Sequence, residues 1–184
     1  MTDVTENDLR AALKALTDVI APSIDPSDPL AGEQLRLVVE YLQFLSARVD
    51  FISDRNRFEL GHNLQLAREL AADAAAVDGA LARQLTVAID SAQALLEAVS
   101  PGTGEVRRGA AVLAALIREL VRKAQACDAA LRDSVERTVL DASGSRIEFE
   151  RAWFLPLGLD PAPGEVVSIE DAIARAGLRS ASDR

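Results

Sequence analysis

The chain has 184 residues, of which 49 % are hydrophobic, 4 % are aromatic and 27 % are charged. This composition is typical of one globular domain, and its abundance of alanine and leucine favours helix. The formal net charge of −9 disfavours nucleic-acid binding, because an acidic surface repels the phosphate backbone. With one cysteine and one histidine, the sequence also excludes an intrachain disulfide and sites that need several histidines.

The first residues are acidic and polar, and no run of about 18 apolar residues occurs, so the sequence predicts neither a secretory signal nor a membrane-spanning helix. Cys127 lies in a helical pattern, and we expect a buried thiol in a reducing compartment. The only lysines are Lys14 and Lys123, and arginine supplies all other basic residues. Such a bias is typical of GC-rich bacterial coding, so we expect a bacterial cytoplasmic protein.

The first predicted helix begins at a variant capping box, Thr5 with Asp8, and ends before Pro22. Residues 21–29 contain three prolines and form a stiff connector. The connector closes with an Asp-Pro pair, which is a strong helix start. The Asp side chain accepts hydrogen bonds from first-turn amides, and proline is well tolerated at the first helical position.

The second predicted helix starts at Pro29 and carries a seven-residue apolar repeat typical of coiled coils, with another apolar stripe beside it. The repeat comprises Leu35, Val38, Leu42, Leu45, Val49 and Ile52, and the other stripe comprises Leu37, Tyr41, Phe44 and Phe51. So wide an apolar face predicts a helix that is buried on more than one side, either centrally in a bundle or between subunits.

The sequence allows three interpretations of where this helix ends. Asn56 followed by Glu59 indicates a new helix start, whereas Gly61 indicates a stop and restart. A continuous helix also fits, because no proline intervenes. We expect a break near residues 53–56 and a third helix that runs to about Val77.

The fourth predicted helix lies between the turn Asp78-Gly79 and the loop at residues 101–104. The fifth runs from about Glu105 to Ala142, where Ser143-Gly144 ends it. It would be about 55 Å long, which is longer than a compact bundle of this size needs. We therefore expect it to project and to pack against another subunit.

The one aromatic-rich apolar run is residues 153–159, which begins with Trp153 and Phe154 and precedes the Pro-rich segment 160–164. That segment cannot be helical. Large apolar groups do not stay in water, so we expect the run to lie as a strap across the bundle, or alternatively as an arm that reaches a partner subunit.

Short helices are predicted on both sides of this run, one over residues 146–153 and a last one that starts at Ser168 with Asp171. Residues 180–184 are expected to fray. The sequence therefore predicts an all-α fold in one domain. An antiparallel bundle of four to five long helices occupies residues 1–145, and a Pro-rich C-terminal strap with a short final helix occupies residues 146–184.

One motif carries a chemical mechanism, because Glu59 and His62 lie three residues apart and would share a helix face. Such a Glu-x-x-His pair is half of the di-iron site of ferritin-like bundles, where carboxylates and imidazoles replace the water shell of the metal. With one histidine in the chain, only a symmetric dimer would supply the second pair. Gly61 weakens the helix that the motif needs, so a capping or surface pair is the simpler interpretation.

Arginines gather after the second helix, and guanidinium groups suit the binding of a phosphate or carboxylate. Acidic residues are interleaved with them, so mutual ion pairing is the simpler interpretation. Tyr41 and Arg48 lie seven residues apart on one stripe. If that stripe faces a cavity, Tyr41, Arg48 and Arg55 are the candidates for orienting the polar head of a ligand.

The helix from Leu9 to Ile20, the connector that closes at Asp28-Pro29 and the helix from Gln34 to Ile52 together resemble small bacterial helical domains of unknown role. Such domains accompany phosphotransferase-like proteins and acyl-CoA dehydrogenases. The resemblance covers about the first hundred residues. It implies an accessory role near acyl-CoA metabolism.

These patterns favour a non-enzymatic helical interaction protein that forms a homodimer through the second and fifth predicted helices. Leu42 and Leu45 of the second helix, with Trp153 and Phe154 of the strap, are the candidate interface residues. The alternatives are a bundle that binds a small apolar or acyl ligand, and a bundle that binds metal through the Glu-x-x-His pair. No cofactor, nucleic acid or membrane is expected as a partner.

Overall fold

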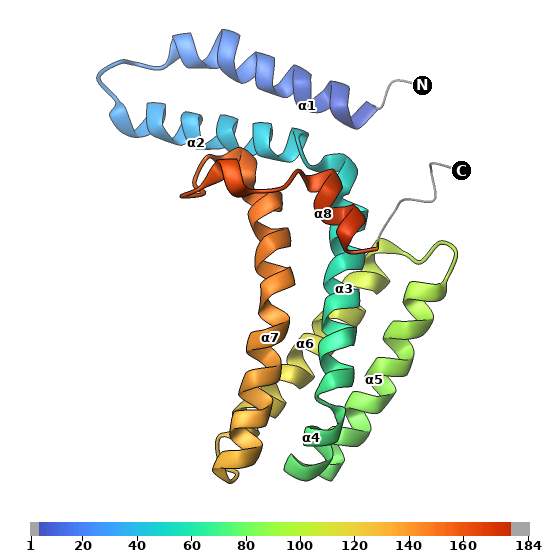
Figure 1. Ribbon diagram of the computed structural model, residues 1–184. Coiled ribbons are helices and arrows are strands. Elements are labelled where there is room, and N and C mark those ends of the chain that lie inside the picture. The colour runs from blue at the N-terminus through green and yellow to red at the C-terminus, as the bar shows by residue number, and fades with distance from the viewer. Residues whose placement is uncertain (1–3, 178–184) are drawn as a thin grey trace. The chain divides into compact units, whose positions relative to one another are not determined.

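The computed structural model describes residues 4–177, which consist of helices and the turns between them and contain no β-strand. The predicted all-α class is therefore confirmed (Figure 1). The chain forms two compact units. The first comprises residues up to Ile52 together with Trp153–Glu165, and the second comprises Ser53–Ala152 and the chain from Val166 onward.

The first unit is built on a helical hairpin. Helix α1 (Val4–Ala15) continues through a π-helical turn, Leu16–Ile20, and a 3-10 turn that contains Pro22. Helix α2 (Pro29–Ser46) returns along it (Figure 1). The predicted start of α2 is confirmed, because the Asp28 carboxylate accepts a hydrogen bond from the main-chain nitrogen of Ala31 at 3.0 Å.

The second predicted helix is shorter than expected, because the backbone leaves the helical conformation at Arg48. A 3-10 turn, Val49–Phe51, then leads directly into α3 (Ile52–Glu69). The break expected at residues 53–56 is wrong, since those residues and Gly61 all lie inside α3. Residues 47–51 contain no proline or glycine that would mark this break in the sequence, and Arg48 there forms a long-range hydrogen bond that is described below.

The second unit is a helical bundle in which α5 packs along α6 (Figure 1). α3 contacts α6 through the hydrogen bond from Asn63 to the Ala110 carbonyl, and it contacts α7 through the stacked rings of Phe58 and Phe149. The helices of this unit after α3 are α4 (Ala71–Val77), α5 (Gly79–Glu97), α6 (Thr103–Ala124), α7 (Ala129–Phe154) and α8 (Ile169–Arg175). The last two residues of α7 belong to the first unit. The largest fully buried side chains come from α3, α5, α6, α7 and the α3–α4 junction: Leu60, Leu70, Leu85, Leu113, Leu120, Val135 and Phe149.

The fifth predicted helix, residues 105–142, is in fact two helices. The chain reverses at residues 125–128, where the Asp128 carboxylate accepts a hydrogen bond from the main-chain nitrogen of Leu131 at 3.0 Å. The two helices measure about 33 and 39 Å, so neither needs to project from the bundle. The predicted end at Ser143-Gly144, and with it the separate helix over 146–153, is also wrong. These residues lie inside α7, and the Ser143 hydroxyl donates a hydrogen bond to the Val139 carbonyl at 2.8 Å.

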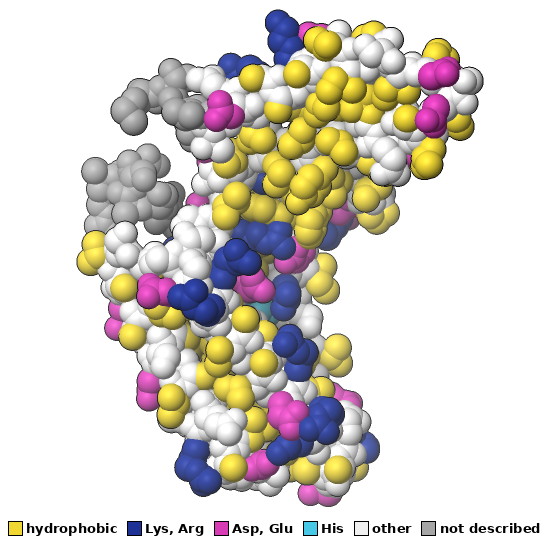
Figure 2. Space-filling view, turned by 180° about the vertical axis from the view of Figure 1, so that it is seen from behind, with side chains coloured by type: hydrophobic (Ala, Val, Ile, Leu, Met, Phe, Trp, Pro, Cys, Tyr) yellow, Lys and Arg dark blue, Asp and Glu magenta, His cyan; other side chains and the backbone are white. Residues whose placement is uncertain are grey.

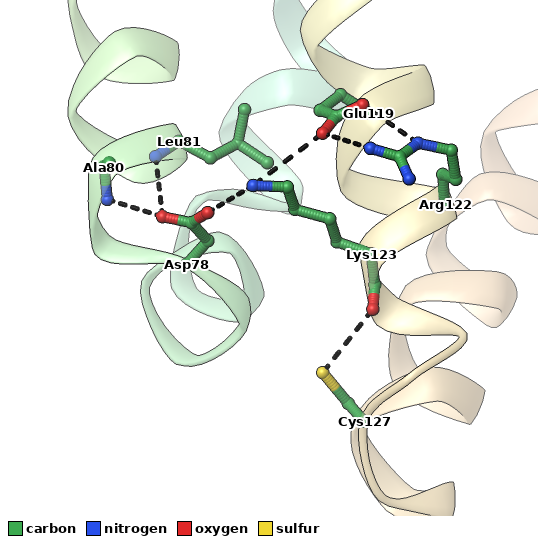
Figure 3. A network of polar contacts seen from close by, with 7 residues as sticks. All are labelled: Asp78, Ala80, Leu81, Glu119, Arg122, Lys123 and Cys127. Carbon is green, nitrogen blue, oxygen red and sulfur yellow. Dashed lines mark hydrogen bonds and ion pairs between the residues drawn. The ribbon is translucent and has the colours of Figure 1, made fainter.

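Cys127 is not the core thiol that the sequence predicted. It lies in the turn between α6 and α7, where its side chain is half-buried and its Sγ lies 3.8 Å from the main-chain oxygen of Lys123 (Figure 3). The apolar pattern of the sequence continues through this turn, but the helix does not, so Cys127 lies on no buried helix face.

The last helix starts as predicted. The Ser168 hydroxyl accepts a hydrogen bond from the main-chain nitrogen of Asp171 at 3.0 Å, and α8 buries Ile169, Ala172 and Ile173. Residues 180–184, which were expected to fray, lie outside the described residues. Within residues 4–177, no helix combines the length and the apolar character needed to cross a membrane.

Candidate functional site

The hairpin of the first unit has an uncovered apolar face. None of the side chains of residues 5–43 is buried. Figure 2 shows hydrophobic side chains gathered over α1 and α2. Amphipathic helices owe most of their stability to an apolar face that another surface covers. The hairpin therefore presents a face that lacks a cover within the first unit.

The seam between the two helices is itself only half-buried. It is formed by leucines and one valine at helical spacing: Leu9 and Leu13 on α1, Leu16 in the π-helical turn that follows, and Leu35, Val39 and Leu42 on α2. In a completed bundle such residues are fully enclosed. Two helices alone leave the seam open along one side.

Beside this seam lies a second stripe of large apolar side chains that is clearly exposed. Leu30, Leu37, Val38 and Tyr41 of α2 expose 68, 45, 48 and 59 % of their surface, and Val19 and Ile20 expose 65 and 45 %. We call the seam and this stripe together the hairpin face.

The charged residues of α2 avoid the hairpin face. Glu33, Arg36 and Glu40 recur at spacings of three and four residues, so they share the other side of the helix. There the Arg36 guanidinium pairs with the carboxylates of both Glu33 and Glu40. The hairpin face therefore contains no charge from these residues and would be desolvated at low cost.

An aromatic cluster closes one end of the hairpin face. Phe44 is 7 % exposed, and its ring lies 5.8 Å from that of Phe154 in a stacked arrangement and 6.2 Å from that of Trp153 edge-on. The Tyr41 ring lies 6.2 Å from Phe44. Trp153 is buried, whereas Phe154 and Tyr41 remain 42 and 59 % exposed. The strap residues thus extend the hairpin face with aromatic surface.

The three predicted ligand-binding residues do not head one cavity. Arg48 is buried and its Nε donates a hydrogen bond to the main-chain oxygen of Trp153 at 2.7 Å, with its guanidinium carbon 5.9 Å from the centre of the Trp153 ring. Arg55 belongs to the second unit, where it pairs with the Glu150 carboxylate at 3.2 Å. Tyr41 is exposed on the hairpin face. Each of the two arginines therefore already has a protein partner.

Glu59 and His62 lie in the second unit on α3, and both are half-buried. The His62 ring is stacked on Phe58 at 5.9 Å, and Phe58 in turn is stacked on Phe149 at 3.8 Å. Burial lowers the pKa of His62, and the nearby Arg146 lowers this pKa further. Among residues 4–177 no three His, Cys, Asp or Glu side chains converge to hold a metal ion, so the pair lacks a third ligand from the described chain.

The sequence interpretation missed an apolar groove between α5 and α6, with a volume of about 560 Å³. Its lining residues are Arg83, Gln84, Val87, Ala88, Ser91, Ala92, Gly109, Val112 and Leu116. The signal was the small side chains on α5, which recur at helical spacing. They predict close helix packing equally well, so they did not distinguish a groove from a packed seam.

Comparison of the chain with protein-family models, with curated proteins and with solved structures finds no significant match.

Proposed function

We propose that this protein is a helical interaction protein that forms a homodimer, with the hairpin face of one protomer packed against that of a second copy. The observation that carries the proposal is that no side chain is buried from residue 5 to residue 43. The apolar surface of two helices alone does not balance the entropy lost when they are ordered. A second apolar surface packed on the hairpin face would bury these side chains.

A second copy supplies such a cover by symmetry. Two identical two-helix layers related by a twofold axis form a four-helix bundle, in which each apolar stripe meets an equivalent stripe. The ion pairs of Arg36 would stay on the solvent side of that bundle. Repulsion between the α2 helices would not oppose the pairing, because the acidic residues Glu33 and Glu40 lie away from the hairpin face and pair with Arg36.

The size of the hairpin face supports a stable dimer. A helix of 18 residues such as α2 is about 27 Å long, and two packed helices are about 20 Å wide. The flat footprint is then about 540 Å², and the corrugated accessible surface is larger, approaching the roughly 800 Å² per partner of a standard interface. The exposed rings of Tyr41 and Phe154 add aromatic anchors, which dominate binding energy at interfaces.

The two predicted interface leucines fit this arrangement. Leu42 and Leu45 are both half-buried on α2, so each retains apolar surface for a partner. Phe154 likewise remains partly exposed, whereas the burial of Trp153 makes it a support for the neighbouring rings.

Sedimentation equilibrium of the full chain, measured over a range of concentrations, tests the proposal. We expect a mass of twice the chain mass of 19.6 kDa. Val38→Asp places a charge in the exposed stripe and should convert the protein to a monomer. Leu140→Asp is the matched control, because Leu140 is 71 % exposed on α7 in the second unit and should leave the dimer intact.

Circular dichroism of both variants shows whether each remains helical. A monomeric wild-type chain at micromolar concentration would contradict the proposal. It would also be contradicted by a Val38→Asp protein that is folded and still dimeric.

A further inference from the structure

The groove between α5 and α6 has the chemistry of a small-molecule site. Its volume of about 560 Å³ lies within the range of roughly 300–1,000 Å³ found for ligand pockets, which are mostly apolar with a few polar groups. All of its lining residues belong to the second unit. The groove therefore shares no residue with the hairpin face.

The groove is lined by small side chains, which leave space between α5 and α6, and by larger apolar side chains at its sides. Ala88, Ala92 and Gly109 remove volume where α5 passes α6. A Cβ at Gly109 would lie 3.0 Å from Leu95 Cδ1, so the helices already pack closely below the groove and cannot collapse to fill it. Val87 and Val112 are 66 and 52 % exposed, which leaves apolar walls in contact with water.

One cation lies beside this apolar surface. Arg83 is the only charged residue in the lining, and it forms no ion pair with any residue between 4 and 177. The Arg83 guanidinium is therefore not neutralised by a described carboxylate, and an anion could approach it from the groove. A guanidinium presents donors in a planar fork that matches a carboxylate.

We propose that the α5–α6 groove binds an amphiphilic monocarboxylate, with the carboxylate on Arg83 and the apolar body along the groove toward Ala92. The two positions are nine residues apart on α5, which is about 13 Å along the helix and suits a medium-length acyl chain. The lining contains no acidic residue to repel the head group, and Gln84, next to Arg83 in the sequence, adds a polar side chain at that end of the groove.

Isothermal titration calorimetry of the full chain with dodecanoate, below its micelle concentration, tests this assignment. Acetate lacks the tail and dodecyltrimethylammonium has a cationic head, so both should bind more weakly than dodecanoate. Arg83→Gln should weaken dodecanoate binding roughly three- to tenfold, the loss expected for one charge-assisted pair at a partly exposed site. Arg83→Lys should restore part of the affinity, and Arg118→Gln, which changes an exposed arginine of α6 outside the lining, should have no effect.

A second variant tests the groove independently of the charge. Ser91→Phe fills the groove from its rim and should abolish dodecanoate binding, whereas Ala94→Phe adds the same ring to an exposed position of α5 outside the lining. Both variants should keep the wild-type helical content and sedimentation mass.

The assignment is overturned if the wild-type chain binds no dodecanoate at millimolar concentration. It is equally overturned if Ser91→Phe or Arg83→Gln binds dodecanoate as tightly as the wild type, or if the cationic surfactant competes with equal affinity. A change of sedimentation mass in Ser91→Phe alone would identify the groove as a contact between copies of the chain and would also refute a ligand site.

Discussion

The side chain of Arg48 donates a hydrogen bond from Nε to the main-chain oxygen of Trp153, at 2.7 Å and across 105 positions of the sequence. Its Nη1 also donates to the carbonyl of Ala47 at 2.9 Å, directly after the end of α2. This one buried guanidinium therefore both marks the end of α2 and holds the strap against it. The aromatic end of the hairpin face depends on that connection.

Arg48→Met should destabilise the protein and loosen the strap. It removes a buried, charge-assisted hydrogen bond whose loss costs about 1–3 kcal/mol of unfolding free energy. Because Trp153 is the only tryptophan, its fluorescence reports on this site alone, and its emission should shift to longer wavelength. Chemical denaturation followed by fluorescence measures both effects. Arg118→Met at an exposed position of α6 is the control, and equal behaviour of the two variants would show that Arg48 does not hold the strap.

Asp78 joins α5 to α6 through a polar network (Figure 3). Its carboxylate accepts hydrogen bonds from the main-chain nitrogens of Ala80 and Leu81, at 2.7 and 3.1 Å, and pairs with the Lys123 ammonium. The Lys123 hydrogen bond lowers the pKa of Asp78 to about 2, with the two amides as the next contributions. The ionised carboxylate therefore contributes stability above a pH of about 3.8, and this contribution disappears as the pH falls toward 2.

Asp78→Asn should consequently lower the thermal midpoint of unfolding at neutral pH, and the difference from the wild type should shrink between pH 4 and pH 2. Differential scanning calorimetry at several pH values measures this. Lys123→Met removes the main cause of the lowered pKa, so in that background the Asp78→Asn difference should be smaller at neutral pH and should disappear at a higher pH. A difference that does not vary with pH would argue against the ion pair.

His62 should titrate below its ordinary pKa of 6.5, because burial disfavours the charged imidazolium and Arg146 repels it. Since it is the only histidine, its ring protons are resolved without assignment in a proton NMR titration. Arg146→Gln should raise the midpoint part of the way toward 6.5. A lowered folded-state pKa means that stability from the neutral ring is present above pH 6.5 and declines as the pH falls. A midpoint at or above 6.5 would contradict the described packing on Phe58.

Gly144→Ala should stabilise the protein by about 0.5–1 kcal/mol, because glycine inside a helix carries an entropic cost that alanine avoids. Gly144 lies within α7, and a Cβ there would meet no atom within 4 Å. Gly158→Ala is the opposite case, since Gly158 has a φ of 69° that alanine adopts only with strain. Urea denaturation of both variants should show changes of opposite sign, and a loss of stability in Gly144→Ala would mean that α7 ends near residue 143 after all.

The helix starts that local chemistry controls were predictable. At Asp28 and Ser168 a side-chain oxygen accepts a hydrogen bond from an amide three residues later, and Asp78 does the same at the start of α5. Every atom of such a cap lies within one turn of the chain. A sequence pattern therefore contains the whole interaction.

The breaks that depend on distant residues were not predictable. α2 ends at Ser46, and the hydrogen-bond acceptor of the neighbouring Arg48 lies on Trp153. The turn at residues 125–128 was missed for a different reason: its Asp128 cap is local, but the turn interrupts an apolar pattern that continues on both sides. Ser143-Gly144 remains helical because α7 continues to Phe149 and Ala152, which are buried at 2 and 0 % exposure. The burial of residues further along α7 outweighs the weak local tendency of Ser143-Gly144 to end the helix.

The candidate site residues also separate into those that local spacing identifies and those whose surroundings depend on distant residues. Tyr41, Leu42 and Leu45 were identified from their spacing, and all three lie on or beside the hairpin face. Arg48 was identified by its spacing from Tyr41 and its charge, and Arg55 by its place in the arginine cluster. Their partners, Trp153 and Glu150, were not visible in the sequence. The α5–α6 groove was missed because small residues at helical spacing do not show whether a neighbour fills the space above them.

The amino-acid sequence by itself determined the all-α class, the capped helix starts and the apolar stripes of α2, because these follow from interactions within a few residues. Only the tertiary structure decided where α2 ends and which apolar stripes are left uncovered. It also decided that the predicted fifth helix is divided into α6 and α7. The physical reason is that burial is a property of neighbouring surfaces. A stripe becomes a core or an interface according to what packs against it, and residues far apart in the sequence determine that packing.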